Sequence, residues 1–126
     1  MRAPAVVRGG AAMRTAIGLA FALAPRSILR RTLRGEQPSA SFVLFARTVG
    51  IRDTLFGLGL LLASFADDAS ATRRWLQLWL ANEAADILAA GAASRQLGFA
   101  GAAAAALPPA SLLTADIWAL RREEMR

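Results

Sequence analysis

Six charged side chains lie inside segments that are otherwise too apolar for a water-exposed surface. They are Arg47, Arg52, Asp53, Glu83, Asp86 and Asp116. A charge is costly in a low-dielectric interior unless it is paired, so residues of this kind are usually structural anchors or functional groups. We therefore expect a polar network of these six residues and Asn82 at the centre of an apolar helical protein.

The composition favours helices in apolar surroundings. Hydrophobic residues make up 56% of the 126 residues and charged residues only 19%, which is more apolar than ordinary soluble domains. Alanine, leucine and glycine dominate, and β-branched residues are scarce. The expected fold class is all-α: a four-helix transmembrane bundle formed by a single integral membrane domain, 1–126.

Missing residue types narrow the possible chemistry. The chain has no cysteine, histidine or tyrosine, and all 15 of its basic residues are arginine. Thiolate and imidazole metal ligands, a lysine Schiff base and a lysine phosphate loop are thereby excluded, so we expect no metal and no cofactor. The net charge of +6 does not indicate nucleic acid, because the arginines flank apolar segments instead of following one face with interleaved aromatics.

Four helices are predicted, at about 10–25, 41–65, 74–94 and 97–119, the last interrupted by Pro108 and Pro109. Residues 26–38 form a short, basic, amphipathic segment that suits a headgroup surface or a solvated loop. Gly35 and Pro38 end this segment, and Ser39 or Ser41 can cap the next helix. Residues 66–74 are expected to be a solvent-exposed loop.

The membrane prediction depends on the charges within the second helix. Residues 54–66 give only 13 uncharged positions, too few to cross about 30 Å of hydrocarbon, so a span must include Asp53 and Arg52. A signal peptide ending at Ala24 and a soluble alanine-rich bundle are the alternatives. Four spans place both termini on one side, and the arginine distribution favours the cytoplasm.

The third helix carries the clearest periodic pattern of the chain. Offsets of three, four and seven residues place its polar and aromatic side chains in one sector: Trp75, Trp79, Asn82, Glu83 and Asp86. The opposite side holds Gln77, Ala81, Ala84, Leu88 and Ala92. We expect the polar stripe to face inward, and the two tryptophans are typical of an interfacial belt.

On the second helix, small residues form a stripe around Asp53: Ala46, Gly50, Gly57 and Ser64. Such spacing lets membrane helices approach closely, which places Asp53 at a helix contact. Bridges between Arg52 and Glu83 or between Arg47 and Asp86 would fix helix pairing. Four interior carboxylates exceed the two arginines, so we expect one carboxyl to retain its proton; Glu83 and Asp86 are the candidates for catalysis.

The stretch 46–62, ARTVGIRDTLFGLGLLL, resembles a recurring motif of small uncharacterised actinobacterial four-helix membrane proteins with a DoxX-like layout. In those proteins a basic residue and a glycine precede an "RD" pair, here Arg52 and Asp53 in "GIRD", and an apolar helix follows. The first helix, which ends in "AP", and the acid-bearing third helix are also similar. The resemblance implies a four-helix membrane fold and no assigned reaction.

Three functions remain open from the sequence. The first is a binding or accessory module in the cell membrane, with lipids, an apolar small molecule, a partner membrane protein or further copies of the chain as partners. The second is a proton- or cation-handling site at Glu83 and Asp86. The third is a small membrane enzyme that uses a protonated carboxyl as general acid on an apolar substrate.

Overall fold

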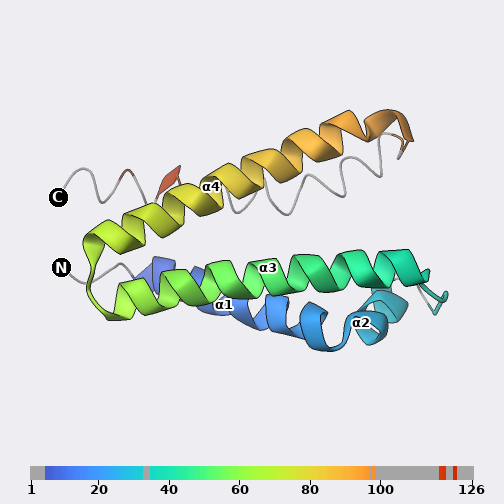
Figure 1. Ribbon diagram of the computed structural model, residues 1–126, viewed down its shortest axis with the longest axis horizontal. Helices are drawn as coiled ribbons and strands as arrows, with labels where there is room; N and C mark the ends of the chain where they lie inside the picture. Colours follow the sequence, from blue (N-terminus) through green and yellow to red (C-terminus); the bar gives the residue numbers. More distant parts are fainter. Residues whose placement is uncertain (1–4, 33–34, 97, 99–116, 119–120, 122–126) are drawn as a thin grey trace. The chain divides into compact units, whose positions relative to one another are not determined.

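The computed structural model describes residues 5–32, 35–96, 98, 117–118 and 121, and its elements are all α-helices (Figure 1). The helices are α1 (Ala5–Leu23), α2 (Pro25–Thr32), α3 (Ala40–Phe65) and α4 (Ala69–Ala92). Two compact units divide the chain: 1–68, which holds α1 to α3, and 69–126, which holds α4. The expected all-helical class is confirmed for the described residues.

The helix boundaries differ from the predicted ones in two places. The first helix starts at Ala5 and not at about residue 10, so Arg8 lies within it instead of before it. The prediction of a loop over 66–74 was wrong, because α4 already starts at Ala69 and only 66–68 connect the helices. Residues 69–72 are alanine, serine, alanine and threonine, which are all compatible with the first turn of a helix. Asp68 precedes this turn at the N-cap position, where aspartate is favoured. The helix predicted at 97–119 falls almost entirely outside the described residues.

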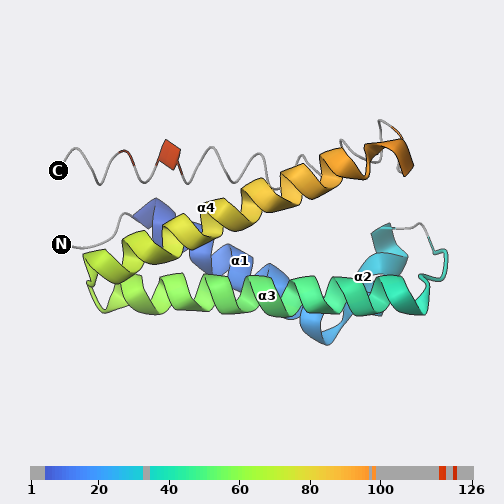
Figure 2. The same ribbon diagram turned by 45° about the horizontal axis from the view of Figure 1, so that its top comes forward.

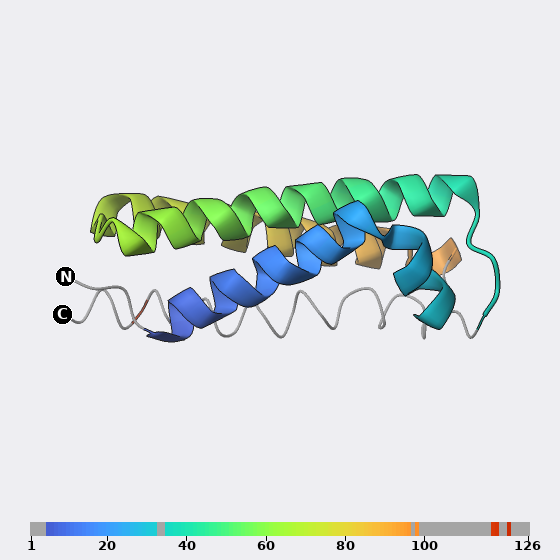
Figure 3. The ribbon, with the colours of Figure 1, turned by 90° about the horizontal axis from the view of Figure 1, so that it is seen from below.

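Helices α1 and α3 pack along each other as an antiparallel hairpin (Figure 3). Glycines form the contact: a Cβ atom added at Gly50 would lie 2.6 Å from the backbone nitrogen of Ala22. One added at Gly18 would lie 2.6 Å from the backbone nitrogen of Thr54. A real side-chain carbon cannot fit at these distances, so backbone rests against backbone, as in membrane helix pairs with small residues.

Hydroxyl groups at this contact bond within their own helix. Thr15 Oγ1 donates to the carbonyl oxygen of Ala11 at 2.8 Å, and Thr54 Oγ1 donates to that of Gly50 at 2.7 Å. These bonds satisfy the polar atoms of the contact without water.

The start of α3 is fixed by a serine cap. Ser39 has an extended backbone, and its Oγ accepts a hydrogen bond from the backbone nitrogen of Phe42 at 3.2 Å. The predicted cap at Ser39 is thus confirmed. Helix α2 lies beside this end of α3 (Figure 2). Its buried Leu29 forms a small core with Val43 and Ala46 of α3.

The outer surface of the hairpin is rich in large apolar side chains. On α3, exposure exceeds half of the residue's surface at Leu44, Phe45, Leu55, Leu62 and Phe65. Only 22% of the apolar stretch of α1 and 28% of that of α3 is buried, unlike the core helix of a soluble protein. By length and composition, α1 and α3 could each cross a membrane.

Candidate functional site

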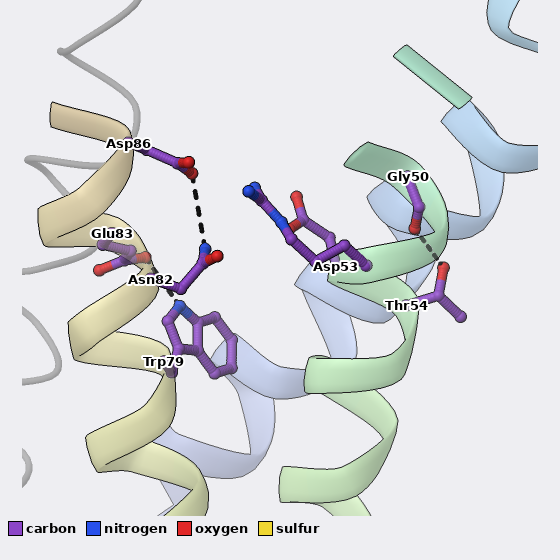
Figure 4. Close-up of polar contacts among 8 residues, drawn as sticks. Gly50, Asp53, Thr54, Trp79, Asn82, Glu83 and Asp86 are labelled. Atoms are coloured by element: carbon purple, nitrogen blue, oxygen red, sulfur yellow. Dashed lines mark hydrogen bonds and ion pairs between the residues drawn. The ribbon is translucent and has the colours of Figure 1, made fainter. Parts of the chain in front are cut away.

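A short side-chain contact of α4 joins a tryptophan to a buried carboxyl group. Trp79 Nε1 donates a hydrogen bond of 2.7 Å to Glu83 Oε1, one turn further along the helix (Figure 4). Glu83 is 1% exposed and Trp79 is 2% exposed. The four-residue spacing brings the two side chains together on one side of the helix. The bond supplies a donor to an acceptor that is buried away from water.

A second polar pair extends the same side of α4. Asn82 Nδ2 lies 3.5 Å from Asp86 Oδ2, at the outer limit for a hydrogen bond (Figure 4). Both residues are half-buried, whereas Ala84 and Leu88 on the other side are exposed. We call Trp79, Asn82, Glu83 and Asp86 the acid-bearing face of α4.

Trp79 differs from its expected role as an interfacial belt residue. Belt tryptophans keep their N–H group at the wet headgroup level, but that of Trp79 is bonded to Glu83 and the side chain is buried. The carboxylate one turn away supplies the acceptor that water would otherwise provide. Trp75, one turn earlier, is half-buried.

The interior charges of α3 contact each other. Arg52 Nε and one of its terminal nitrogens both lie 3.2 Å from Asp53 Oδ1, and the two side chains are 31% and 23% exposed. The pairing lowers the cost of carrying both charges in an apolar helix. Arg47 is exposed. It lies about 10 Å from the start of α3 at Ala40, since an α-helix rises 1.5 Å per residue.

The bridges expected between Arg52 and Glu83 and between Arg47 and Asp86 would join the two units, so both stay predictions. Asp116 lies outside the described residues. Within the described part of the chain, no three acidic side chains gather as metal ligands would. Within each unit the described contacts of the predicted polar residues form one local group: the ion pair of Arg52 and Asp53 on α3, and the acid-bearing face of α4.

Arg8 is the polar residue that the sequence patterns missed. One of its terminal nitrogens donates to the carbonyl oxygen of Ser64 at 2.7 Å and lies 3.3 Å from Asp67 Oδ1. The guanidinium carbon also lies 5.0 Å from the centre of the Phe65 ring. Arg8 thus ties the start of α1 to the end of α3. Arg14, further along α1, is buried at 7% exposure.

The chain was compared with family models, curated proteins and solved structures, and none of them matches it.

Proposed function

We propose that this chain is a small multi-pass membrane protein that serves as a binding or accessory module, with the acid-bearing face of α4 as its recognition surface. The α1–α3 hairpin supports the membrane location, because large apolar side chains cover its outside while glycines fill the contact between the helices. The observation that carries the binding role is Glu83, whose carboxylate is buried at 1% exposure and oriented by Trp79.

The location belongs to the same proposal. We place the chain in the cell membrane with both termini in the cytoplasm, on the general plan of DoxX-like proteins. The arginine distribution supports this orientation, since Arg73 and Arg74 lie close to the connector 66–68 and further arginines lie near both chain ends.

A buried carboxylate suits recognition for an energetic reason. Away from water, a hydrogen bond to a charged acceptor is stronger than on a surface, and an unmatched partner leaves the charge poorly satisfied. A ligand that offers a donor to the half-buried Asp86 and an apolar body to the helix would fit this face, while Glu83 holds Trp79 in place beneath it. Fitting partners are an apolar small molecule with one polar group, a helix of a partner membrane protein, or a second copy of this chain.

Photocrosslinking in membranes tests the proposal. A photoreactive phenylalanine analogue replaces Ile87, which neighbours Asp86 and is half-buried, or Leu88, which is 74% exposed. We expect discrete crosslinked species from position 87 and only bulk lipid from position 88. Adding Glu83→Gln and Asp86→Asn should remove the discrete species while the protein level is unchanged. Identical products at both positions would contradict the recognition surface.

The second candidate is proton handling at Glu83 and Asp86. It is favoured by the spacing of the two carboxyls, three residues apart on one side of α4, with one of them buried. Proteoliposomes with a pH-sensitive dye inside should acidify faster than empty vesicles under an imposed gradient. Glu83→Gln should abolish the difference; equal rates with and without the protein would eliminate this function.

A further inference from the structure

Helix α2 is fixed at the end of the hairpin where α1 ends and α3 begins (Figure 3). Ala24 joins the two helices directly: its nitrogen bonds to Ala20 at 2.9 Å, and its carbonyl oxygen accepts from Ile28 at 3.2 Å. Pro25, the first residue of α2, is fully buried. Proline is well suited to this first helical position. Residues 25–32 therefore form a helix joined to α1 by these two hydrogen bonds, and not a basic loop.

The apolar side of α2 is already covered by protein. Leu29 is 6% exposed and packs against Val43 and Ala46 of α3. An amphipathic helix that binds membranes by itself inserts its apolar side between lipid chains. Here the hairpin occupies that side, so any affinity of α2 for a membrane surface must come from its other side.

Outside that covered side, α2 carries three exposed arginines. Arg30 and Arg31 lie on the side away from the buried Pro25 and Leu29, and Arg26 lies about a quarter-turn from the buried side. Just beyond the helix, the nitrogen of Gly35, with φ +93°, donates to the carbonyl oxygen of Arg30 at 2.8 Å. Guanidinium groups bind phosphate through paired N–H donors. The helix thus presents three exposed groups able to bind phosphate, Arg26, Arg30 and Arg31, which we call the α2 arginine cluster.

We infer that the α2 arginine cluster binds the phosphate groups of anionic phospholipids at the membrane surface. The inference rests on the membrane location proposed above. If α1 and α3 both cross the bilayer, α2 lies where both spans leave the hydrocarbon, and that level is occupied by headgroups. A soluble phosphate compound or a nucleic acid would compete there with a far higher local concentration of lipid phosphate.

Lipid selection by the full-length protein tests this inference. The purified chain is incubated with equal amounts of phosphatidylglycerol and phosphatidylcholine, and retained lipids are counted by native mass spectrometry. We expect the wild type to prefer phosphatidylglycerol. The triple variant Arg26→Gln, Arg30→Gln, Arg31→Gln should lose this preference, by roughly fivefold for each arginine removed.

The matched control removes three arginines of α4 and the residues after it: Arg73→Gln, Arg74→Gln, Arg95→Gln. These arginines are also exposed, so the net charge falls equally, but we expect the preference to persist. An equal loss in both triples would show unspecific attraction and overturn the assignment to α2. Displacement of phosphatidylglycerol by excess inorganic phosphate would overturn the assignment to lipid.

Failure of this inference can be separated from failure of the proposed function. Carbonate extraction of membranes is measured for the wild type and both triple variants. If carbonate releases the wild type, the membrane location fails and the headgroup assignment fails with it. If all three proteins stay in the membrane and the α2 triple still prefers phosphatidylglycerol, only the headgroup assignment is wrong.

Discussion

At the scale of single residues, Arg8 connects the start of α1 to the end of α3 through three contacts of unequal strength. Its hydrogen bond to the Ser64 carbonyl oxygen is short, at 2.7 Å, and a bond of this type to a charged donor contributes about 1.5–3 kcal/mol. The ion pair with Asp67 is partly solvated, at 26% and 44% side-chain exposure, and such pairs contribute about 0–1 kcal/mol. The backbone carbonyl is therefore the main partner of Arg8.

This ranking predicts that a substitution of Arg8 lowers the free energy of unfolding more than a substitution of Asp67. Arg8→Met should lower the free energy of unfolding by about 2 kcal/mol, because it removes the bond to Ser64 as well as the ion pair. Asp67→Asn should cost less than about 1 kcal/mol. Asn also tolerates the left-handed backbone of Asp67, with φ 54°, so no strain is added. Thermal unfolding in detergent, followed by circular dichroism, measures both; equal costs would contradict the ranking.

The bond from Trp79 to Glu83 is tested by a double-mutant cycle. Trp79→Phe should cost about 1–3 kcal/mol beside the native Glu83, because it leaves a buried acceptor without its donor. In the Glu83→Gln background the same change should cost less beyond any shared loss of packing, since the carboxyl acceptor of the bond is already gone. Denaturant unfolding of the four proteins gives the coupling energy. A coupling energy of zero would mean that the bond contributes nothing.

At the scale of helices, glycines determine how α1 and α3 pair. Inside a bilayer, lipid chains are as apolar as the helix contact, so association depends on close packing instead of water release. Gly18 and Gly50 lie backbone to backbone, as the atoms a Cβ would meet at each position show. Gly9, Gly10 and Gly91, in contrast, have open space around them.

Alanine substitutions should therefore have opposite signs at the two kinds of glycine. In open space, Gly→Ala raises helix propensity, so Gly10→Ala and Gly91→Ala should be neutral or stabilising by up to about 1 kcal/mol. At the contact, Gly18→Ala or Gly50→Ala forces the helices apart and should destabilise the hairpin. Unfolding in detergent gives the signs. Stabilisation at positions 18 and 50 would show that α1 and α3 do not pack this closely.

The sequence predicted the α3 side of this contact but not its partner. The stripe of Ala46, Gly50, Gly57 and Ser64 was visible from its spacing, and all four residues are buried. Its position against Gly18 was not visible, because one helix does not define the register of another. The contact of Gly18 with Thr54 also explains why Arg8 reaches Ser64. Arg8 is ten residues before Gly18 in α1, and Ser64 is ten residues after Thr54 in the antiparallel α3. The equal rise of both helices brings them to the same level.

The acid-bearing face of α4 illustrates the same limit for the candidate site. The three- and four-residue offsets were sufficient to predict that Trp79 and Glu83 share one side of the helix, and they are hydrogen-bonded in the structure. The pairing of arginines with carboxylates on other helices depends on tertiary packing. The periodicity of a single helix carries no information about that packing. The bridge expected from Arg52 to Glu83 stays a prediction for this reason, whereas the ion pair of Arg52 with Asp53 lies within α3.

At the scale of the whole molecule, the exposed apolar side chains require an explanation. Leu55 and Leu62, near the middle and the end of α3, are 60% and 63% exposed. A leucine at the centre of a membrane span favours insertion by about 0.5 kcal/mol. The same side chain exposed to water would gain nothing from burial of its apolar surface. A bilayer around α1 and α3 would cover these residues and would leave α2 and the connector 66–68 on opposite surfaces.

Cysteine labelling tests that arrangement cleanly, because the native chain has no cysteine. Single cysteines are placed at exposed positions in α2 (Ser27→Cys), in the connector (Ala66→Cys) and in the middle of α3 (Leu55→Cys). In intact cells, a membrane-impermeant maleimide should label position 27 and should reach position 66 only after permeabilisation, because the proposed orientation puts the connector in the cytoplasm. Position 55 should stay unlabelled in both states, since lipid covers it. Labelling of 66 but not 27 in intact cells would reverse the orientation and keep the hairpin, whereas labelling of all three after permeabilisation would contradict a hairpin that crosses the membrane.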